Sequence, residues 1–335
     1  MQKRNAKENK TMMNTTTNLL AECAIRKAGP VSHVSTQWLN EVSPDLKESS
    51  IIKYEDILHH YILPFFGDTE LSDITNENLL CFVNELRTTG GVKKKGLEPS
   101  TVSEIVTTMN ALRIYALRRD LPIHFDTKCV NIKHEKHSIR VFSVSEENLL
   151  IEYLRENINP IHLGILLCLY TGIRVGELCA LKWDAINLTD KTMRIGQTMQ
   201  RIRVNGKEYK TEVKILEPKS ASSFRKIPLP EVLIIQLNRY YTPKAYFLSG
   251  DIEKFVEPRS MQKRFNTILK RCDIRPANFH ATRHTFATRC VELGFDIKSL
   301  SEILGHSSVN ITLNKYVHPT MDQKKKNMNL LPETF

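Results

Sequence analysis

Four residues near the C-terminal end of the chain could act together on a phosphate group. In chain order they are His280, Arg283, His306 and Tyr316. A tyrosine hydroxyl has an ordinary pKa of about 10, so it attacks phosphorus poorly unless its surroundings favour the phenolate. Guanidinium groups bind the oxygens of a pentacoordinate phosphorane bidentately, and an imidazole can donate a further hydrogen bond. These residue types in this order indicate phosphoryl transfer onto tyrosine.

Three short helices are predicted to position these side chains. His280 and Arg283 are three residues apart and therefore share one face of a helix that ends at Gly294. A second helix ends at Gly305, which puts His306 on the turn that follows. The predicted caps are Asp296 for the second helix and Ser308 or Asn310 for the third helix, which carries Tyr316.

Each of these residues also has an ordinary structural explanation. A tyrosine can simply pack, an arginine can lie on a solvated helix face, and a histidine after a glycine can cap a turn. His280 and His284 are four apart, as zinc-binding histidines often are. However, Ala281 stands where a zinc peptidase needs its general-base glutamate, so a metal site is disfavoured.

The same residues resemble a motif of the tyrosine recombinases, the phage-integrase family. The second catalytic box of that family runs His-x-x-Arg, then Leu-Gly-His, then a tyrosine about ten residues later. In this chain the box is matched by His280, Arg283, Leu304-Gly305-His306 and Tyr316. The resemblance implies that Tyr316 is the nucleophile and that His280 is its proton acceptor or hydrogen-bond partner.

A second stretch, TGIRVGELCALKW, resembles the first box of the family, Thr-Gly-x-Arg-x-Gly-Glu. Arg174 lies in it directly before a predicted helix N-terminus, where the local field favours an anion. The resemblance implies that Arg174 is a phosphate clamp and that Glu177 orients it. The family often continues with Trp-x-Asp-Ile, whereas this chain has Trp183-Asp184-Ala185-Ile186, a difference that we assign to the surface.

The middle of the second half has β character. Residues 192–204 and 207–216 are predicted strands around the two-residue turn Asn205-Gly206, and residues 224–228 form a return strand. The string PKSASSFRKIPL is similar to the family hairpin that presents a catalytic lysine, and Lys219 is the matching position. Lys214 and Lys226 are weaker candidates. An ammonium group on a flexible stem could protonate the 5′ oxygen that leaves during cleavage.

Composition and charge agree with a nucleic-acid partner. The 335 residues are 41% hydrophobic and 25% charged, with a net charge of +11, and a basic surface attracts DNA. The polar N-terminus contains no secretory signal and no apolar run is long enough to span a bilayer, so we expect a cytoplasmic protein without a membrane partner. The seven scattered cysteines are expected to be free thiols, and we expect no metal and no cofactor.

The predicted fold is mainly α with a small antiparallel β-sheet, in a helical core-binding domain followed by an α+β catalytic domain. We expect a basic flexible segment over residues 1–31, a helical DNA-binding domain over 32–137, a catalytic domain over 138–318 and a tail over 319–335 that could dock on a neighbouring protomer. A linker is predicted at 134–143, and Ser143 with Glu146 forms a capping-box pattern. The DNA-binding candidates in the first domain are Lys93, Lys94, Lys95, Ser100 and Thr101.

The resemblance therefore implies a site-specific DNA recombinase that forms a 3′-phosphotyrosyl intermediate. Its partners would be double-stranded recombination sites, three further copies of itself in a tetramer and accessory DNA-bending proteins. Integration or excision of a mobile element is favoured over resolution of chromosome dimers. The alternatives are a type IB topoisomerase with the same chemistry, a non-catalytic DNA-binding regulator and a metal hydrolase.

Overall fold

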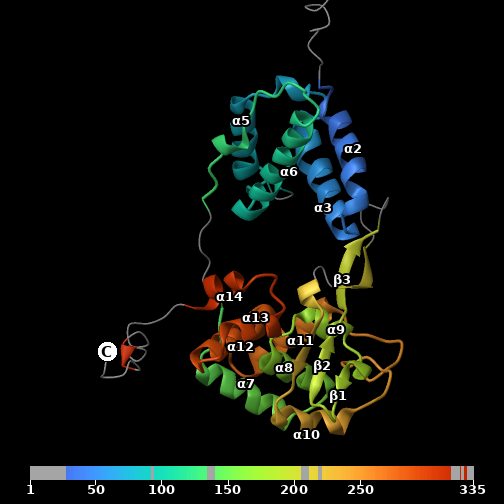
Figure 1. The fold of residues 1–335 in the computed structure, drawn as a ribbon, viewed down its shortest axis with the longest axis vertical. Coiled ribbons are helices and arrows are strands. Elements are labelled where there is room, and N and C mark those ends of the chain that lie inside the picture. Colours follow the sequence, from blue (N-terminus) through green and yellow to red (C-terminus); the bar gives the residue numbers. More distant parts are fainter. Residues whose placement is uncertain are drawn as a thin grey trace, which may run out of the picture. The chain divides into compact units, whose positions relative to one another are not determined.

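The computed structural model describes residues 28–91, 94–133, 140–204, 211–217, 221–317, 325 and 328–329. The chain divides into two compact units, Met1–Lys136 and His137–Phe335, each with its own hydrophobic core (Figure 1). Helices predominate in both units, as predicted, and the strands belong to the second. Over the described ranges, no helix combines the length and the apolarity that crossing a bilayer requires.

The first unit is built from helices packed around apolar side chains such as Leu79, Phe82 and Met109. Pro64 lacks an N–H group, and the chain passes through a π-helical turn just before it, between α3 and α4. Thr75 caps α5 in a capping box with Asn78. The helices are α2 (Val31–Val42), α3 (Glu48–Ile57), the π-turn (Leu58–Ile62), α4 (Leu63–Phe66), α5 (Asn76–Thr88) and α6 (Pro99–Leu117).

Helix α6 begins without a side-chain hydrogen bond at its N-cap. Its N-cap is Glu98 and its first residue is Pro99, so Ser100 and Thr101 lie inside the first turn. Proline is favoured at this position because its fixed φ suits the helix and its missing N–H would be unpaired there anyway. Ser100 is exposed and Thr101 is partly exposed.

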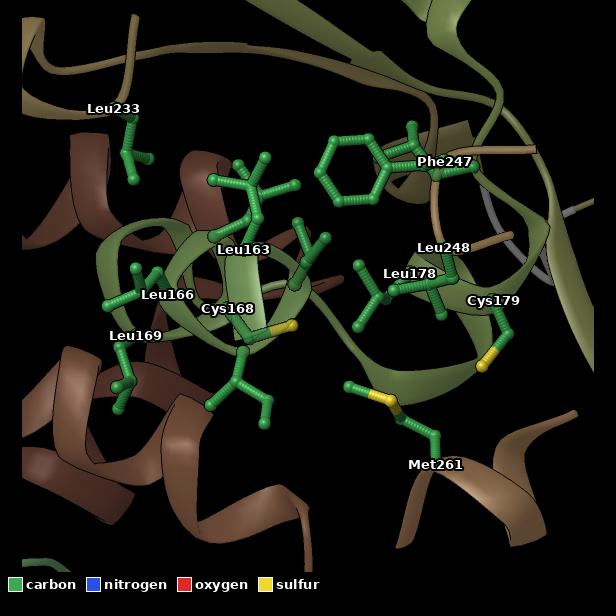
Figure 2. Close-up of a cluster of buried hydrophobic side chains, with 14 of the residues drawn as sticks. Leu163, Leu166, Cys168, Leu169, Leu178, Cys179, Leu233, Phe247, Leu248 and Met261 are labelled. Atoms are coloured by element: carbon green, nitrogen blue, oxygen red, sulfur yellow. The ribbon is translucent and has the colours of Figure 1, made fainter. Parts of the chain in front are cut away.

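The core of the second unit surrounds α8 (Pro160–Thr171), a helix that is apolar on all sides and therefore buried. Figure 2 shows Leu163, Leu166 and Cys168 of this helix among side chains of its neighbours. The helix contacts α7 (Val144–Glu156), α9 (Val175–Ala180) and α10 (Glu231–Tyr240), and α11 (Pro258–Arg271) packs on α9. The predicted capping box of Ser143 and Glu146 at the start of α7 is confirmed.

The strands form two small antiparallel sheets, and here the sequence prediction was partly wrong. The strand predicted over 192–204 is two strands, separated at Gly196-Gln197, that belong to different sheets. β2 (Thr192–Ile195) lies between β1 (Ile186–Asn187) and β5 (Arg225–Pro228), while β3 (Thr198–Arg203) pairs with β4 (Thr211–Leu216). β5 thus returns to β2 and not to β4. The predicted turn at Asn205-Gly206 lies outside the described residues.

Three consecutive helices complete the second unit: α12 (His280–Glu292), α13 (Ile297–Leu304) and α14 (Val309–Tyr316). They pack on one another (Figure 1). The predicted caps are confirmed, because Asp296 accepts from the Ser299 backbone N–H and Ser308 accepts from that of Asn310. The stop of α13 at Gly305 is also confirmed, since this residue adopts φ +66°.

Candidate active site

The four C-terminal residues singled out by the sequence come together through these three helices. His280 and Arg283 lie in the first turns of α12, His306 lies on the turn after α13, and Tyr316 is the last residue of α14. Arg174 joins them as the N-cap residue of α9. All five belong to the second unit, so its fold alone positions them.

Tyr316 is buried, and its hydroxyl is held by a histidine other than the one predicted. The residue is 7% exposed, and its hydroxyl lies 2.9 Å from Nδ1 of His284. His284 occurs one helical turn after His280, so both imidazoles lie on the same face of α12, with ring centroids 4.6 Å apart. The direct hydrogen-bond partner of Tyr316 is therefore His284, and His280 contacts it through His284.

Arg283 connects two helix C-termini. Its Nη1 donates to the carbonyl of Gly172 over 2.8 Å, and its Nη2 donates to the carbonyl of Leu304, also over 2.8 Å. Gly172 ends α8 and Leu304 ends α13, where backbone carbonyls have no partner within the helix and carry partial negative charge. These acceptors offset part of the cost of burying a guanidinium that is only 2% exposed.

Gly172 is required where it stands. It adopts φ +64°, and a Cβ atom there would approach within 2.5 Å of the Phe286 ring and within 2.8 Å of Leu304. The close approach of α8 to α12 and α13 at this point is what lets one arginine reach both helix ends.

Arg174 and Arg225 share the carboxylate of Glu177. Arg174 donates from Nη1 to Oε1 over 2.7 Å and from its backbone N–H to Oε2 over 2.9 Å. Arg225 binds both oxygens, over 3.1 Å from Nη1 and 2.8 Å from Nη2. The Glu177 side chain is only 3% exposed. This contact agrees with the orienting role expected of Glu177.

The backbone at the C-terminal end of α13 binds three arginines of the site. Three successive carbonyls, of Ile303, Leu304 and Gly305, each accept a hydrogen bond from a different guanidinium. The donors are Arg225 to Ile303 over 2.6 Å, Arg283 to Leu304 over 2.8 Å and Arg174 to Gly305 over 3.3 Å. The partial negative charge of a helix C-terminus therefore gathers cations directly beside His306.

His306 lies parallel to the ring of Tyr316, with an interplanar angle of 5° and centroids 6.3 Å apart. Its Nδ1 lies 2.8 Å from Oγ1 of Thr312, a fully buried residue of α14. If the Thr312 hydroxyl donates to Nδ1, then the imidazole carries its proton on Nε2, where it can donate to an incoming phosphate oxygen.

Burial and the cations of the site both favour the neutral form of its histidines. Burial, followed by the charges of nearby cations such as Lys315 and Arg283, lowers the pKa of His284 to about 3 and of His306 to about 3. Loss of solvent around its ring, followed by the charge of Arg283, lowers the pKa of His280 as well.

Burial, followed by the charge of Arg174, lowers the pKa of Arg283 to about 9. Burial raises the pKa of Tyr316, while the charge of Arg283 acts in the opposite direction. For Glu177 burial acts to raise the pKa, but the hydrogen bonds and charge of Arg225 and the charge of Arg174 outweigh it, so that the net shift is downward. The site thus holds a carboxylate and an excess of guanidinium charge, which suits a bound phosphate.

The remaining predicted residues fall into two groups. Lys219 and Lys93 fall outside the described residues, and Lys94, Lys95, Ser100 and Thr101 belong to the first unit. Among the described residues, no group of three or more His, Cys, Asp or Glu side chains is close enough to hold a metal ion.

Two members of the site, His284 and Arg225, were not predicted from the sequence. The spacing of His280 and His284 had been considered only as a metal-binding pattern. Arg225 gave no signal, because a single arginine in a short β-strand is typical of a surface residue.

Comparisons with known proteins agree with this geometry. The model of the phage integrase family matches residues 140–323, and that of the phage integrase N-terminal SAM-like domain matches residues 31–87. A tyrosine recombinase XerC-like protein of Caldanaerobacter subterraneus subsp. tengcongensis is 27% identical over 331 residues, which cover 89% of this chain and 81% of that protein. A tyrosine recombinase XerC of Myxococcus xanthus is 34% identical over 157 residues, covering 45% of this chain and 48% of that protein.

Solved structures share the fold. The Tn1549 transposon integrase in complex with a circular intermediate DNA aligns with a TM-score of 0.71 at 20% identity, covering 89% of this chain and 99% of that chain. A lambda integrase dimer bound to a COC′ core site aligns with a TM-score of 0.63 at 14% identity, covering 90% and 81% of the two chains.

This chain therefore belongs to the phage integrase family. It is an enzyme of the tyrosine recombinase type, whose members break and rejoin DNA strands.

Proposed function

We propose that Tyr316 is the nucleophile of a site-specific recombinase and that the surrounding cations bind the scissile phosphate. The phenol oxygen attacks phosphorus and forms a 3′-phosphotyrosyl bond, while the bond from phosphorus to the deoxyribose 5′ oxygen breaks. Arg174, Arg283 and His306 hold the non-bridging oxygens, and Lys219 protonates the leaving oxygen. Because the tyrosyl ester retains the energy of the phosphodiester, attack by a 5′ hydroxyl reverses the step without ATP.

We further propose that His284 accepts the proton of Tyr316. The 2.9 Å separation of Nδ1 from the phenol oxygen is the observation that carries the proposal. A pKa of about 3 keeps the imidazole neutral before DNA binds, so Nδ1 has a lone pair available when Nε2 carries the proton. A bound phosphate adds negative charge, which raises the pKa of the imidazole as the phenol loses its proton. His280, one turn earlier, then serves as a donor to the phosphate.

A covalent-adduct experiment tests these roles. Duplexes that become attached to the protein are first selected from a random-sequence pool and recovered from a denaturing gel. Tyr316→Phe should bind a selected duplex as the unchanged protein does but form no adduct. A normal adduct yield in that variant would overturn the assignment of the nucleophile.

The two histidines are separated with the same duplex. We expect His284→Asn to lower the single-turnover rate of adduct formation by about 100-fold or more, within the range typical of general acid–base catalysis. His280→Asn retains the pH dependence of phenol deprotonation, whereas His284→Asn shifts it toward higher pH. The same pH profile in both variants would remove His284 from this role.

An apolar groove on the second unit supports assembly of several copies. It has a volume of about 610 Å³ and is lined by residues of α7, α8, β5, α12 and α13, with Val144, Leu293 and Phe295 exposed at its surface. We propose that the C-terminal tail of a neighbouring copy, with Met328, Leu330 and Leu331, fills this groove in a tetramer on DNA, as the family resemblance implies. Most of the tail lies outside the described residues. A lambda integrase tetramer bound to a Holliday junction is a solved structure with the same fold.

Deletion of residues 324–335 tests this arrangement. The truncated protein should bind a single selected duplex but form no four-protomer complex in sedimentation experiments. An unchanged assembly would contradict docking of the tail.

The proposed biological role is integration and excision of a mobile element in the cytoplasm, assisted by DNA-bending proteins. The basic N-terminal stretch of the sequence favours this role because it adds positive charge outside the domains that cut DNA. Resolution of chromosome dimers is the second candidate, since the curated relatives include proteins named XerC. A circular DNA with joined ends, present only when the gene is intact, would favour the first role. Chromosome dimers that accumulate on deletion of the gene would favour the second.

A further inference from the structure

Arg225, the first residue of β5, is a buried arginine to which neither sequence box assigns a role. Its side chain is only 6% exposed. Besides the two bonds to Glu177, its Nε donates to the Ile303 carbonyl over 2.6 Å and its Nη1 donates to the Ser223 carbonyl over 3.1 Å. The guanidinium is thus engaged on all three nitrogens by acceptors of the protein itself.

The contacts of Arg225 lead to Arg174 along two routes. The first passes through Glu177, whose Oε1 accepts from both guanidinium groups and whose Oε2 accepts from Arg225 and from the backbone N–H of Arg174. The second passes through the end of α13, where Arg225 holds the Ile303 carbonyl and Arg174 holds the Gly305 carbonyl. The Arg225 side chain also fills the space beside Gly305, since a Cβ added there would lie 3.0 Å from it.

The two arginines differ in accessibility, which separates their tasks. The Arg174 side chain is 36% exposed and can turn part of its fork toward a phosphate, whereas that of Arg225 is enclosed. When Arg174 donates hydrogen bonds to a phosphate, the buried carboxylate of Glu177 still requires a bidentate cation to remain ionised and in place. Arg225 supplies that cation, and a lysine could not, because its point charge lacks the planar fork.

We propose that Arg225 is a positioning residue that fixes the Arg174 phosphate clamp by holding Glu177 and the C-terminal end of α13. It acts through these groups and never touches the DNA. The inference rests on the proposed role of Arg174 as a phosphate clamp.

The test compares Arg225→Lys with the unchanged protein in single-turnover adduct formation on a selected duplex. We expect the affinity for the duplex to be unchanged and the rate of adduct formation to fall by about 100-fold, the typical cost of a misplacement of about 1 Å. A second duplex carries a methylphosphonate at the scissile position. This group has one charged oxygen fewer than a phosphate, so less negative charge has to be stabilised by Arg174. On this duplex the rates of adduct formation of the two proteins should differ by less than about threefold, because the positive charge of Arg174 then stabilises little negative charge.

A general loss of structure would slow adduct formation equally on both duplexes. A positioning role would slow it mainly on the phosphate duplex, so the two explanations can be distinguished. Arg113→Lys is the matched control, since Arg113 also donates Nε to a carbonyl, that of Phe125, and pairs with a carboxylate, that of Asp126, but in the first unit. It should form adduct at the normal rate. The double variant Arg174→Lys with Arg225→Lys should be no slower than Arg174→Lys alone.

A normal adduct rate in Arg225→Lys, or an undiminished deficit on the methylphosphonate duplex, would overturn the inference and leave the nucleophile assignment intact. Adduct formation by Tyr316→Phe would overturn the proposed function instead.

Discussion

The two units differ in what they bury. In the described part of the first unit the buried polar side chains are uncharged, namely Ser35, Ser72 and Thr108. The second unit buries Glu177, Arg283 and His284. Burial of apolar side chains therefore suffices for the first unit, whereas the second also encloses ionisable groups that would be more favourably solvated in water.

The second unit can enclose these groups because its backbone provides acceptors for them. The ends of α8 and α13 supply carbonyls for guanidinium groups, and Glu177 is the buried carboxylate that joins two of those groups. Burial, followed by the charge of the nearby cations, lowers the pKa values of His284 and His306 and so favours their neutral form. This difference between the units supports the proposal that the second unit binds an anion from outside, and the buried ionisable groups lower its stability.

The largest expected effects concern the separate cores. Leu163→Ala in the second unit and Met109→Ala in the first should each lower the free energy of unfolding of their own unit by about 2–5 kcal/mol, because each removes a fully buried side chain and leaves a cavity. Native-state hydrogen exchange, followed by mass spectrometry of peptides, measures the protection of each unit. An equal loss of protection in both units after either substitution would contradict separate cores.

The next largest expected effect is a pH dependence of the stability of the second unit. His284 and His306 have pKa values of about 3 in the folded chain, well below the ordinary value near 6.5. As the pH falls below 6.5 the unfolded chain takes up protons that the folded chain does not, so stability falls with falling pH. Each ring should contribute up to about 1.4 kcal/mol of lost stability at pH 5.5 relative to pH 7.5.

Urea unfolding at pH 7.5 and 5.5 measures this dependence. The double variant His284→Gln with His306→Gln should lose less stability between the two pH values than the unchanged protein. A pH dependence that is the same in both proteins would show that these rings do not cause it.

The smallest expected effect concerns the lysines of the first unit, which would contact phosphates without taking part in chemistry. Lys94 and Lys95 are exposed in the loop before α6. Lys94→Ser with Lys95→Ser should weaken binding of a selected duplex and reduce the slope of log affinity against log salt by up to about 2. The rate of adduct formation at saturating DNA should be unchanged, and a lower rate there would contradict a role limited to binding.

Local patterns predicted much of the fold. The caps at Ser143, Asp296 and Ser308 were read correctly because a cap is decided by neighbours within one helical turn. The division of residues 192–204 between two sheets was missed, since β character gives the propensity of a strand but not its partner.

The sequence by itself determined which residues are proposed to react, because the order and spacing of Arg174, the His-x-x-Arg pair, His306 and Tyr316 suit the chemistry of a phosphate and a phenol. Only the tertiary structure decided how these groups are held. His284 reaches Tyr316, and Arg225 reaches Glu177, through contacts between residues 32 and 48 positions apart in the chain. Such contacts depend on how helix ends and strands pack together, and no local pattern of residues encodes that packing.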